Sequence, residues 1–282
     1  MPELPELEIL KEILERRVLR REIAAARALR PGILKTLTPG LDTLCGKAFT
    51  GITRRGKHLI FTLDDNAHLL IHLMLAGRLV LCGSGTRPTK ATGLFVRVTD
   101  GQDLRLVENG SVKRARAYLV ADPKEVREVA GAGPEPLSSA FTYQVLAQRI
   151  TARRTQVKKL LTDQRLIAGI GSAYADEILF RARISPVRYA STLGDDEIVR
   201  LYEAIGSILR EAIDAIRAAA GEDPFTDDIR DFMRVVKKTG KPCPACGTRI
   251  EEIRYAATRT YYCPACQAGG RTIRDRRAWL TR

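Results

Sequence analysis

The sequence predicts an α+β protein, in which an N-terminal helix and an antiparallel β-sandwich are followed by a helical region and a cysteine-bearing β-hairpin. Three observations lead to this class. Apolar residues recur at three- and four-residue steps near the N-terminus, they alternate with other residues from about residue 49, and helical periodicity returns in the second half. The length of 282 residues corresponds to about two domains at ~150 residues each.

The composition narrows the class of protein further. Hydrophobic residues make up 45% and charged residues 28%, which is typical of a globular chain. No apolar run approaches the ~18 residues that a membrane span needs, and Met1-Pro2-Glu3 begins no secretory leader, so we expect a cytoplasmic protein that does not bind a membrane. The 47 Lys and Arg against 33 Asp and Glu give a net charge of +14, which favours nucleic acid as the partner over an acidic membrane surface.

The first half contains one helix and several strands. Pro5 is suited to a first helical position, and the residues after it form one apolar stripe: Leu7, Leu10, Ile13, Leu14 and Val18. Period-two patterns then predict strands around residues 58–63, 69–71, 94–98 and 104–106, with turns at 64–66 and 100–101. This half is therefore expected to be an antiparallel sheet or sandwich that carries the helix.

The second half is helical. A Gly- and Pro-rich stretch at residues 131–136 is the best candidate for a linker. Apolar residues at helical spacing run from Ile198 to Ile216, and the acidic residues 195–197 are placed where a helix N-terminus favours negative charge. This pattern predicts a long core helix. Polar residues 221–242 then form a looser connection.

Four of the six cysteines have the spacing of a metal site. Cys243 and Cys246 are separated by sixteen residues from Cys263 and Cys266, so two tight turns can each offer two thiolates to one ion. We expect one structural Zn²⁺ with these four ligands. The arginines and tyrosines between the pairs indicate a hairpin that contacts nucleic acid; a purely structural ribbon is the alternative, and a dithiol redox pair is less favoured.

The N-terminus has the residues of a reactive amine site. Removal of Met1 would expose the secondary amine of Pro2, and an α-amino group titrates near ~8 whereas lysine titrates near ~10.4. Its adduct with an aldehyde carbon is an iminium that cannot lose its charge, and Glu3 and Glu6 could move protons or orient the site. Taken alone, the stretch is more often a simple helix start, with Pro5 in the first turn.

Several motifs occur together in one fixed order, and in this combination the chain resembles the formamidopyrimidine-DNA glycosylase and endonuclease VIII family along nearly all of its length. The motifs are Met-Pro-Glu-Leu-Pro-Glu at residues 1–6, Arg-Arg-Gly-Lys at 54–57, Gly-Pro-Glu-Pro-Leu-Ser at 133–138, Leu-Thr-Asp-Gln-Arg at 161–165, Ala-Gly-Ile-Gly at 168–171, Tyr-Ala-Asp-Glu at 174–177 and the four-cysteine motif.

The resemblance implies a base-excision repair enzyme that removes oxidised bases and cleaves the strand by β,δ-elimination. Pro2 would be the nucleophile that attacks C1′, Glu3 the general acid and base, and Glu6 its acidic partner. Lys57 would engage the lesion and its flanking phosphates. His72 matches a DNA-contacting histidine of the family, although a lone histidine on an apolar strand is more often a packed, neutral one.

The resemblance also implies a helix–two-turn–helix module at about residues 143–188, in which Gly169 and Gly171 let backbone amides approach a phosphate. Three DNA-reading positions depart from the family or shift. Ser172 replaces an asparagine of the module, and Arg259 of the finger contacts a phosphate from a shifted position. Leu75 stands where a methionine fills the space left by the flipped base; Met74 is one place away and is therefore expected on the opposite face of the strand.

The expected domains are a catalytic sandwich at 1–135, a helical DNA-binding domain at 136–236, a zinc finger at 237–270 and a basic tail at 271–282. The expected partner of this monomeric enzyme is damaged double-stranded DNA. Because the segment that reads the opposite base in the family is absent near residues 108–113, a lesion-binding protein that no longer excises bases is the alternative. A general nucleic-acid-binding module with a zinc ribbon is a third hypothesis.

Overall fold

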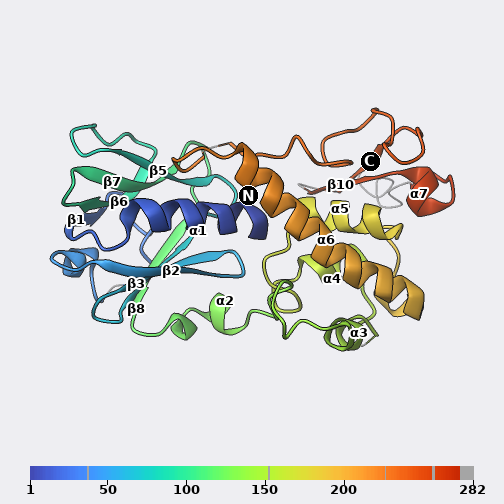
Figure 1. The fold of residues 1–282 in the computed structure, drawn as a ribbon, viewed down its shortest axis with the longest axis horizontal. Coiled ribbons are helices and arrows are strands. Elements are labelled where there is room, and N and C mark those ends of the chain that lie inside the picture. The colour runs from blue at the N-terminus through green and yellow to red at the C-terminus, as the bar shows by residue number, and fades with distance from the viewer. Residues whose placement is uncertain (37, 152, 226, 256–257, 274–282) are drawn as a thin grey trace, which may run out of the picture. The chain divides into compact units, whose positions relative to one another are not determined.

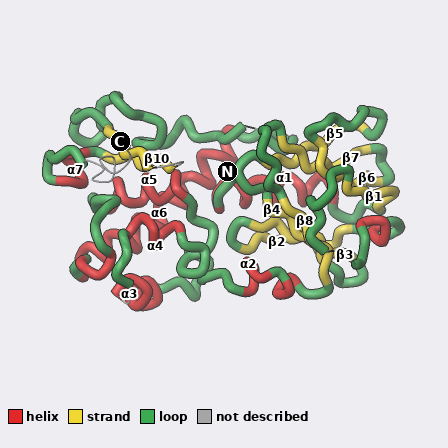
Figure 2. The backbone as a smooth tube through the Cα atoms, turned by 180° about the vertical axis from the view of Figure 1, so that it is seen from behind, coloured by secondary structure: helices red, strands yellow, loops and turns green. Residues whose placement is uncertain are grey.

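The computed structural model describes residues 1–36, 38–151, 153–225, 227–255 and 258–273. The chain divides into two compact units, which are Met1–Ala132 with Ile213–Ile229, and Gly133–Ala212 with Arg230–Arg282. The strands of the two four-stranded sheets belong to the first unit, and the second unit is mostly helical (Figure 2). Residues 274–282, which include most of the expected basic tail, lie outside the described residues.

The first unit begins with α1 (Leu4–Val18), which confirms the predicted N-terminal helix. Glu3 is its N-cap and Pro5 lies in its first turn, where a missing N–H breaks no helical hydrogen bond. The predicted apolar stripe is buried, with Leu14 fully inaccessible. In Figure 1, α1 runs alongside the two sheets of this unit, and its stripe joins their common core.

Two antiparallel four-stranded sheets form the sandwich, as the alternating pattern predicts. One has the order β1-β6-β7-β5 and the other β2-β3-β4-β8. The strands of the first sheet are β1 (Ile23–Ala28), β6 (Thr92–Val98), β7 (Gln102–Glu108) and β5 (Gly77–Gly83). Those of the second are β2 (Phe49–Arg55), β3 (His58–Leu63), β4 (His68–His72) and β8 (Arg116–Val120).

Strand β1 was not expected from the sequence, because its Ala-rich segment has little intrinsic preference for a strand. It forms because it pairs along β6 at the edge of the sheet. The sandwich core is completed by contacts such as that between Phe49 and Phe61, whose ring centroids are 5.1 Å apart. Short helices border the sheets: η1 (Leu41–Leu44), η2 (Pro123–Glu125) and α2 (Arg127–Ala130).

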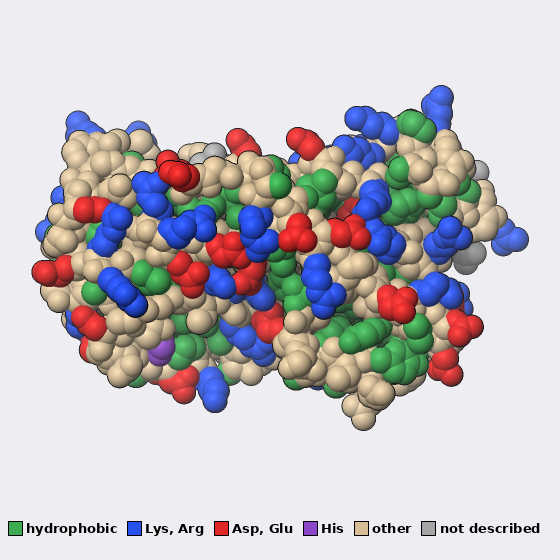
Figure 3. Space-filling model, viewed as in Figure 1, with side chains coloured by type: hydrophobic (Ala, Val, Ile, Leu, Met, Phe, Trp, Pro, Cys, Tyr) green, Lys and Arg blue, Asp and Glu red, His purple; other side chains and the backbone are tan. Residues whose placement is uncertain are grey.

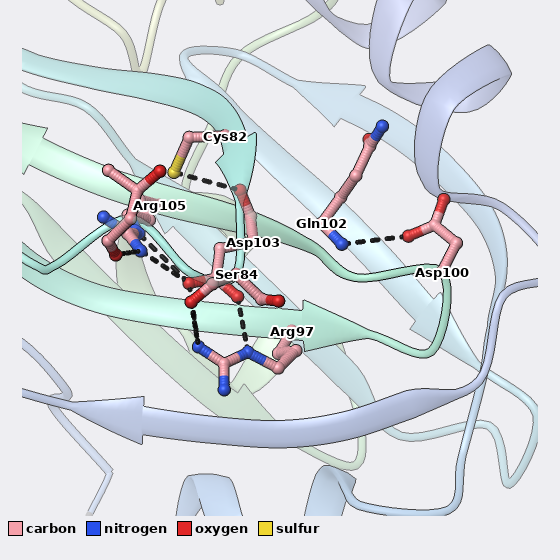
Figure 4. A network of polar contacts seen from close by, with 8 residues as sticks. Cys82, Ser84, Arg97, Asp100, Gln102, Asp103 and Arg105 are labelled. Carbon is pink, nitrogen blue, oxygen red and sulfur yellow. Dashed lines mark hydrogen bonds and ion pairs between the residues drawn. The ribbon is translucent and has the colours of Figure 1, made fainter.

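A buried polar network ties together three strands of the first sheet (Figure 4). Asp103 is completely inaccessible, and its carboxylate accepts hydrogen bonds at 2.7 Å from Arg97 Nε and from a terminal nitrogen of Arg105. Arg97 also donates to the carbonyl of Ser84. Burial raises the pKa of Asp103, but the hydrogen bonds from the two arginines outweigh it and hold that pKa below its usual value. The network therefore keeps a buried charge fully paired.

The second unit contains α3 (Tyr143–Thr151), α4 (Val157–Thr162), α5 (Ser172–Ala182), the short η3 (Ala190–Thr192) and most of α6 (Asp195–Ala219). The long helix predicted from its apolar stripe is thus confirmed as α6. The cysteine motif follows as an antiparallel hairpin of β9 (Glu251–Tyr255) and β10 (Thr258–Tyr262), then α7 (Pro264–Ala268). None of the described helices combines the length and the apolar sequence that crossing a bilayer requires.

Candidate active site and nucleic-acid interface

The three candidate residues at the N-terminus lie together at the start of α1. Pro2 is buried, the exposed fraction of Glu3 is 3%, and Glu6 is completely inaccessible. The backbone N–H of Glu3 donates to Glu6 Oε2 at 2.9 Å, and Glu3 in return caps the first turn. The simple helix-start interpretation is therefore correct as far as local structure goes. The same capping bonds hold two carboxylates in fixed positions beside Pro2.

The N-terminal amine has an acidic neighbour that sequence reasoning did not identify. The nitrogen of Met1 lies 3.9 Å from Asp228 Oδ2, and a terminal nitrogen of Arg78 lies 3.2 Å from the other oxygen of Asp228. Asp228 belongs to the segment after α6 that packs with the first unit. No local pattern marks this residue, because only the return of the chain places it beside the N-terminus.

Lys57 occupies the two-residue turn between β2 and β3. The first turn residue, Gly56, has a positive φ of 56°, which favours glycine and is typical of tight hairpins. The exposed fraction of Lys57 is 7%, unusually low for a lysine in a turn. The turn therefore presents Lys57 from a well-defined position in the same unit as α1.

His72, the last residue of β4, is a neutral hydrogen-bond acceptor. Its Nδ1 accepts from the backbone N–H of Met74 at 2.9 Å, and its ring packs edge-on against His58 with centroids 4.5 Å apart. Burial lowers the pKa of His72 to about 3 and that of His58 to about 4. Because Nδ1 accepts this hydrogen bond, the single proton of the neutral His72 ring is on Nε2.

Leu75 lies at the tip of the turn between β4 and β5, with 58% of its surface exposed. Strand β4 ends at His72, so the strand alternation assumed for Met74 and Leu75 does not apply; that expectation is wrong, because both residues belong to the turn. Met74 has a positive φ of 53°. Gly77 is required where the turn closes, since a Cβ there would lie 2.3 Å from the carbonyl oxygen of Leu73.

A second exposed apolar residue lies on a neighbouring loop. Val112, between β7 and β8, is also 58% exposed. A Cβ at Gly110 of that loop would lie 3.6 Å from Ala76 Cβ in the Leu75 turn, so the two loops approach each other closely. Sequence reasoning missed Val112; the available signal was a single apolar residue within an otherwise polar segment.

In the second unit, the residues of the helical module and of the hairpin meet. Ser172 Oγ donates to the carbonyl of Arg259 at 3.4 Å, and Lys158 Nζ donates to the same carbonyl at 3.1 Å. The side chain of Arg259 is exposed. Three sequence-predicted phosphate contacts, Gly171, Ser172 and Arg259, thus come from adjoining segments. By contrast, the N–H of Gly169 donates to Gln164 Oε1 at 2.9 Å and stabilises the turn internally.

A buried ion pair lies beneath this junction. Lys158 Nζ lies 2.7 Å from Asp176 Oδ1, while Asp176 Oδ2 accepts from the backbone N–H of Tyr261 at 3.0 Å. Burial raises the pKa of Asp176 to about 7, against the opposing effect of Lys158. Asp176 therefore connects α5 with β10, and Lys158 connects α4 with both.

The four predicted metal ligands are assembled in one cluster. Their sulfur atoms all lie within 4.8 Å of one another; Cys246 Sγ, for example, is 3.5 Å from Cys263 Sγ and 3.4 Å from Cys266 Sγ. A tetrahedral Zn²⁺ with bonds of ~2.3 Å places its sulfurs about 3.8 Å apart, so the cluster fits one zinc ion. Gln267 bonds the backbone N–H of Cys263 and the carbonyl of Ile184, which anchors the finger to the helical module.

Basic side chains are spread over the visible face of both units, with acidic ones between them (Figure 3). The exposed Arg259 and the positive net charge of +14 agree with a polyanionic partner.

Family models match three segments of the chain. Residues 1–115 match the formamidopyrimidine-DNA glycosylase N-terminal domain, residues 132–221 the formamidopyrimidine-DNA glycosylase H2TH domain, and residues 240–269 a zinc finger found in FPG and IleRS.

Full-length relatives and solved structures are also similar to the chain. The formamidopyrimidine-DNA glycosylase of Pelotomaculum thermopropionicum is 34% identical over 278 residues, which cover 95% of this chain and 99% of the relative. That of Symbiobacterium thermophilum is 36% identical, with 95% and 89% covered. A structure of the Lactococcus lactis enzyme with abasic-site DNA has a TM-score of 0.85 at 29% identity, with 94% of this chain and 99% of that chain covered.

Proposed function

The chain belongs to the formamidopyrimidine-DNA glycosylase family, and from this we propose which residues carry out base excision and strand cleavage. It is a DNA glycosylase of base-excision repair, and its finger holds one structural zinc through Cys243, Cys246, Cys263 and Cys266. A bound zinc would cross-link the two cysteine turns and so fix the hairpin that carries Arg259. The observation that supports the assignment best is the buried group of Pro2, Glu3 and Glu6 at the start of α1.

In the proposed reaction, Met1 is removed and the nitrogen of Pro2 attacks C1′ of the damaged nucleotide. The nitrogen–C1′ bond forms while the glycosidic bond breaks, and the departing base takes up a proton. Ring opening gives an iminium. Glu3 then removes a proton from C2′, the electron pair moves toward the iminium, and the 3′ phosphate leaves; a second elimination releases the 5′ phosphate. Glu6 holds Glu3 through the 2.9 Å hydrogen bond to its N–H.

The same proposal assigns the contacts with damaged duplex DNA. Lys57 engages the lesion strand, Leu75 fills the space that the extruded base leaves, and His72 holds the turn that carries Leu75. Arg259 and the first turn of α5 after Gly171 bind a phosphate, with Ser172 and Lys158 supporting the backbone of Arg259. Gly169 then has a conformational role rather than a contact with phosphate, since its N–H is bonded to Gln164.

The substrate class that we propose is inferred from the DNA bound in solved structures of similar enzymes, in addition to the site itself. Solved structures of the Lactococcus lactis enzyme contain DNA with an abasic site or with Fapy-dG. We therefore propose oxidised bases in duplex DNA as substrates of this chain, acting as a monomer in the bacterial cytoplasm. The proposed functional regions are 1–135 for catalysis, 136–236 for DNA binding, 237–270 for the zinc finger and 271–282 as a basic extension.

One observation favours a second candidate, a lesion-binding protein that does not excise bases. Near residues 108–113 the Nζ of Lys113 donates to the carbonyl of Glu108, and the Glu108 carboxylate accepts from the backbone N–H groups of Arg114 and Ala115. These hydrogen bonds join the two ends of the loop, and Val112 is a large apolar residue exposed on it. The family segment that reads the opposite base is absent from this position, and this absence is the reason for considering the second candidate.

Borohydride trapping tests the assignment. The purified protein is incubated with duplexes that carry an abasic site, Fapy-dG, 8-oxoguanine or an oxidised pyrimidine, and a reduced covalent adduct is measured. We expect an adduct that depends on Pro2. In Pro2→Gly the adduct should fall at least about ten-fold, because the Schiff base of a primary amine can lose its proton and is then a weaker electron sink. Intact duplex binding without an adduct on any substrate would leave the second candidate.

A further inference from the structure

The turn that carries Lys57 is held by an ion pair that the mechanism above does not use. Arg54, the penultimate residue of β2, donates from Nε to Glu8 Oε2 on α1 at 2.9 Å. A terminal nitrogen of the same guanidinium donates to the carbonyl of Gly56 at 2.9 Å. One side chain therefore connects α1, at whose N-terminal end Pro2, Glu3 and Glu6 lie, with the residue that precedes Lys57.

The pair is placed where it can hold a fixed geometry. The side chain of Arg54 is only 8% exposed and that of Glu8 is 24% exposed, so solvent screens their interaction less than at an open surface. Burial raises the pKa of Glu8, but hydrogen bonds from Lys11 and Arg54 outweigh it and hold that pKa below its usual value. Glu8 thus stays charged at neutral pH and keeps both cations in place.

The first residue of the turn has no side chain that could hold it. Gly56 lacks one, and its positive φ of 56° is a conformation that other residues rarely adopt. The Gly56 carbonyl accepts a hydrogen bond from Arg54, and the neighbouring Arg55 donates to the carbonyl of Ala132 at 2.7 Å. Two consecutive arginines of β2 therefore hold the two sides of the turn, and Arg54 links it to α1.

We propose that Glu8 and Arg54 are positioning residues that set the distance between the reactive N-terminus of α1 and Lys57. This inference rests on the proposed function, because it assigns to Lys57 a contact with the DNA. Neither Glu8 nor Arg54 needs to touch the substrate. Since catalysis depends on the reacting groups meeting within a few tenths of an ångström, a released turn should misplace Lys57 without unfolding the unit.

A double-mutant cycle between Glu8 and Lys57 tests the proposal. Glu8→Ala is expected to lower the single-turnover excision rate about ten-fold in the wild-type background and to have no further effect in Lys57→Ala. Glu8→Gln, which keeps an acceptor for Arg54, should retain most of the activity. Glu12→Ala is the matched control, because Glu12 also lies on α1 and pairs with Arg217 instead.

A second measurement does not depend on catalysis. If Lys57 contacts a phosphate, both Glu8→Ala and Lys57→Ala should reduce the slope of log binding constant against log salt by about 0.9, and the double variant by no more than either. Multiplicative effects of the two substitutions on excision, or a Glu8→Ala variant with wild-type rate and salt slope, would overturn the proposal. A wild-type protein that binds duplex DNA but forms no trapped adduct would refute the proposed function. The salt dependence of binding would still test the positioning role of Glu8 and Arg54, because it does not require catalysis.

Discussion

Lys158 Nζ lies 2.7 Å from Asp176 Oδ1, and this buried pair joins the helical module to the zinc hairpin. Lys158 also donates to Thr260 Oγ1 at 2.8 Å, and Asp176 accepts from the backbone N–H of Tyr261. The two charges therefore fix where β10, and with it Arg259, lies against α4 and α5. Both α-helices and the hairpin belong to one compact unit, so the pair acts within it.

Lys158→Met should destabilise this unit strongly, because it leaves the carboxylate of Asp176 buried without its cation. Breaking such a pair costs about 3–5 kcal/mol. The double variant Lys158→Met/Asp176→Asn should regain part of the loss, since its Asn side chain carries no charge. Urea denaturation at pH ~8.5, where Asp176 with its pKa of about 7 is ionised in the wild type, measures the free energy of unfolding. A single variant as stable as the wild type would show that the ion pair does not hold the hairpin.

The edge-to-face pair of His58 and His72 predicts a loss of stability in acid. Burial lowers the pKa values of His58 and His72 to about 4 and about 3, below the ordinary value near ~6.5. The unfolded chain therefore takes up protons first as the pH falls. The stabilising contribution is complete above pH ~6.5 and is lost progressively toward pH ~4, at about 1.4 kcal/mol per pH unit for each histidine.

Denaturation curves at several pH values between 7 and 4.5 measure this slope. His58→Phe should reduce the slope by the contribution of one histidine, whatever its effect on stability at pH 7. An unchanged slope in that variant would mean that other groups cause the acid sensitivity.

Leu75→Ala should impair extrusion of a damaged base while strand cleavage at a preformed abasic site continues nearly unchanged. The reason is that the exposed side chain is expected to occupy the space of the extruded base, and an abasic site has no base to extrude. We expect a loss of about ten-fold or more in excision, equal to ~1.4 kcal/mol. Excision and abasic-site cleavage are measured side by side in single-turnover assays.

Leu29→Ala is the matched control for this experiment, because Leu29 is a comparably exposed leucine of the same unit, at 43%. Equal losses of the Leu75 variant on both substrates would exclude a wedge role for Leu75.

Removal of zinc should abolish DNA binding before it unfolds the sandwich. The four cysteines are the cross-link that closes the hairpin, and Cys263 is joined to the helical module through Gln267. Treatment with a strong chelator, followed by metal analysis and duplex binding, checks this. We expect one zinc per chain and loss of binding in parallel with its release, while thermal unfolding of the first unit is retained. Full binding by metal-free protein would contradict the expectation.

The local features of this protein could be predicted from the sequence because neighbouring residues encode them. The stripe of α1, the long helix α6 and the spacing of the four cysteines are periodic patterns, and each is found in the structure. The ordered motifs likewise predict the family. Strand β1 could not be predicted in this way, because an Ala-rich segment becomes a strand only through pairing with β6.

The arrangement of the site was decided by tertiary structure. Asp228 beside the N-terminus, the meeting of Ser172 with Arg259, and the bond from Arg54 to Glu8 all join residues that are distant in sequence. No periodicity encodes such contacts, since they depend on how whole elements pack and on which buried charges must be paired. The sequence by itself determined which chemical groups the protein carries and on which elements. Packing decided which of them meet.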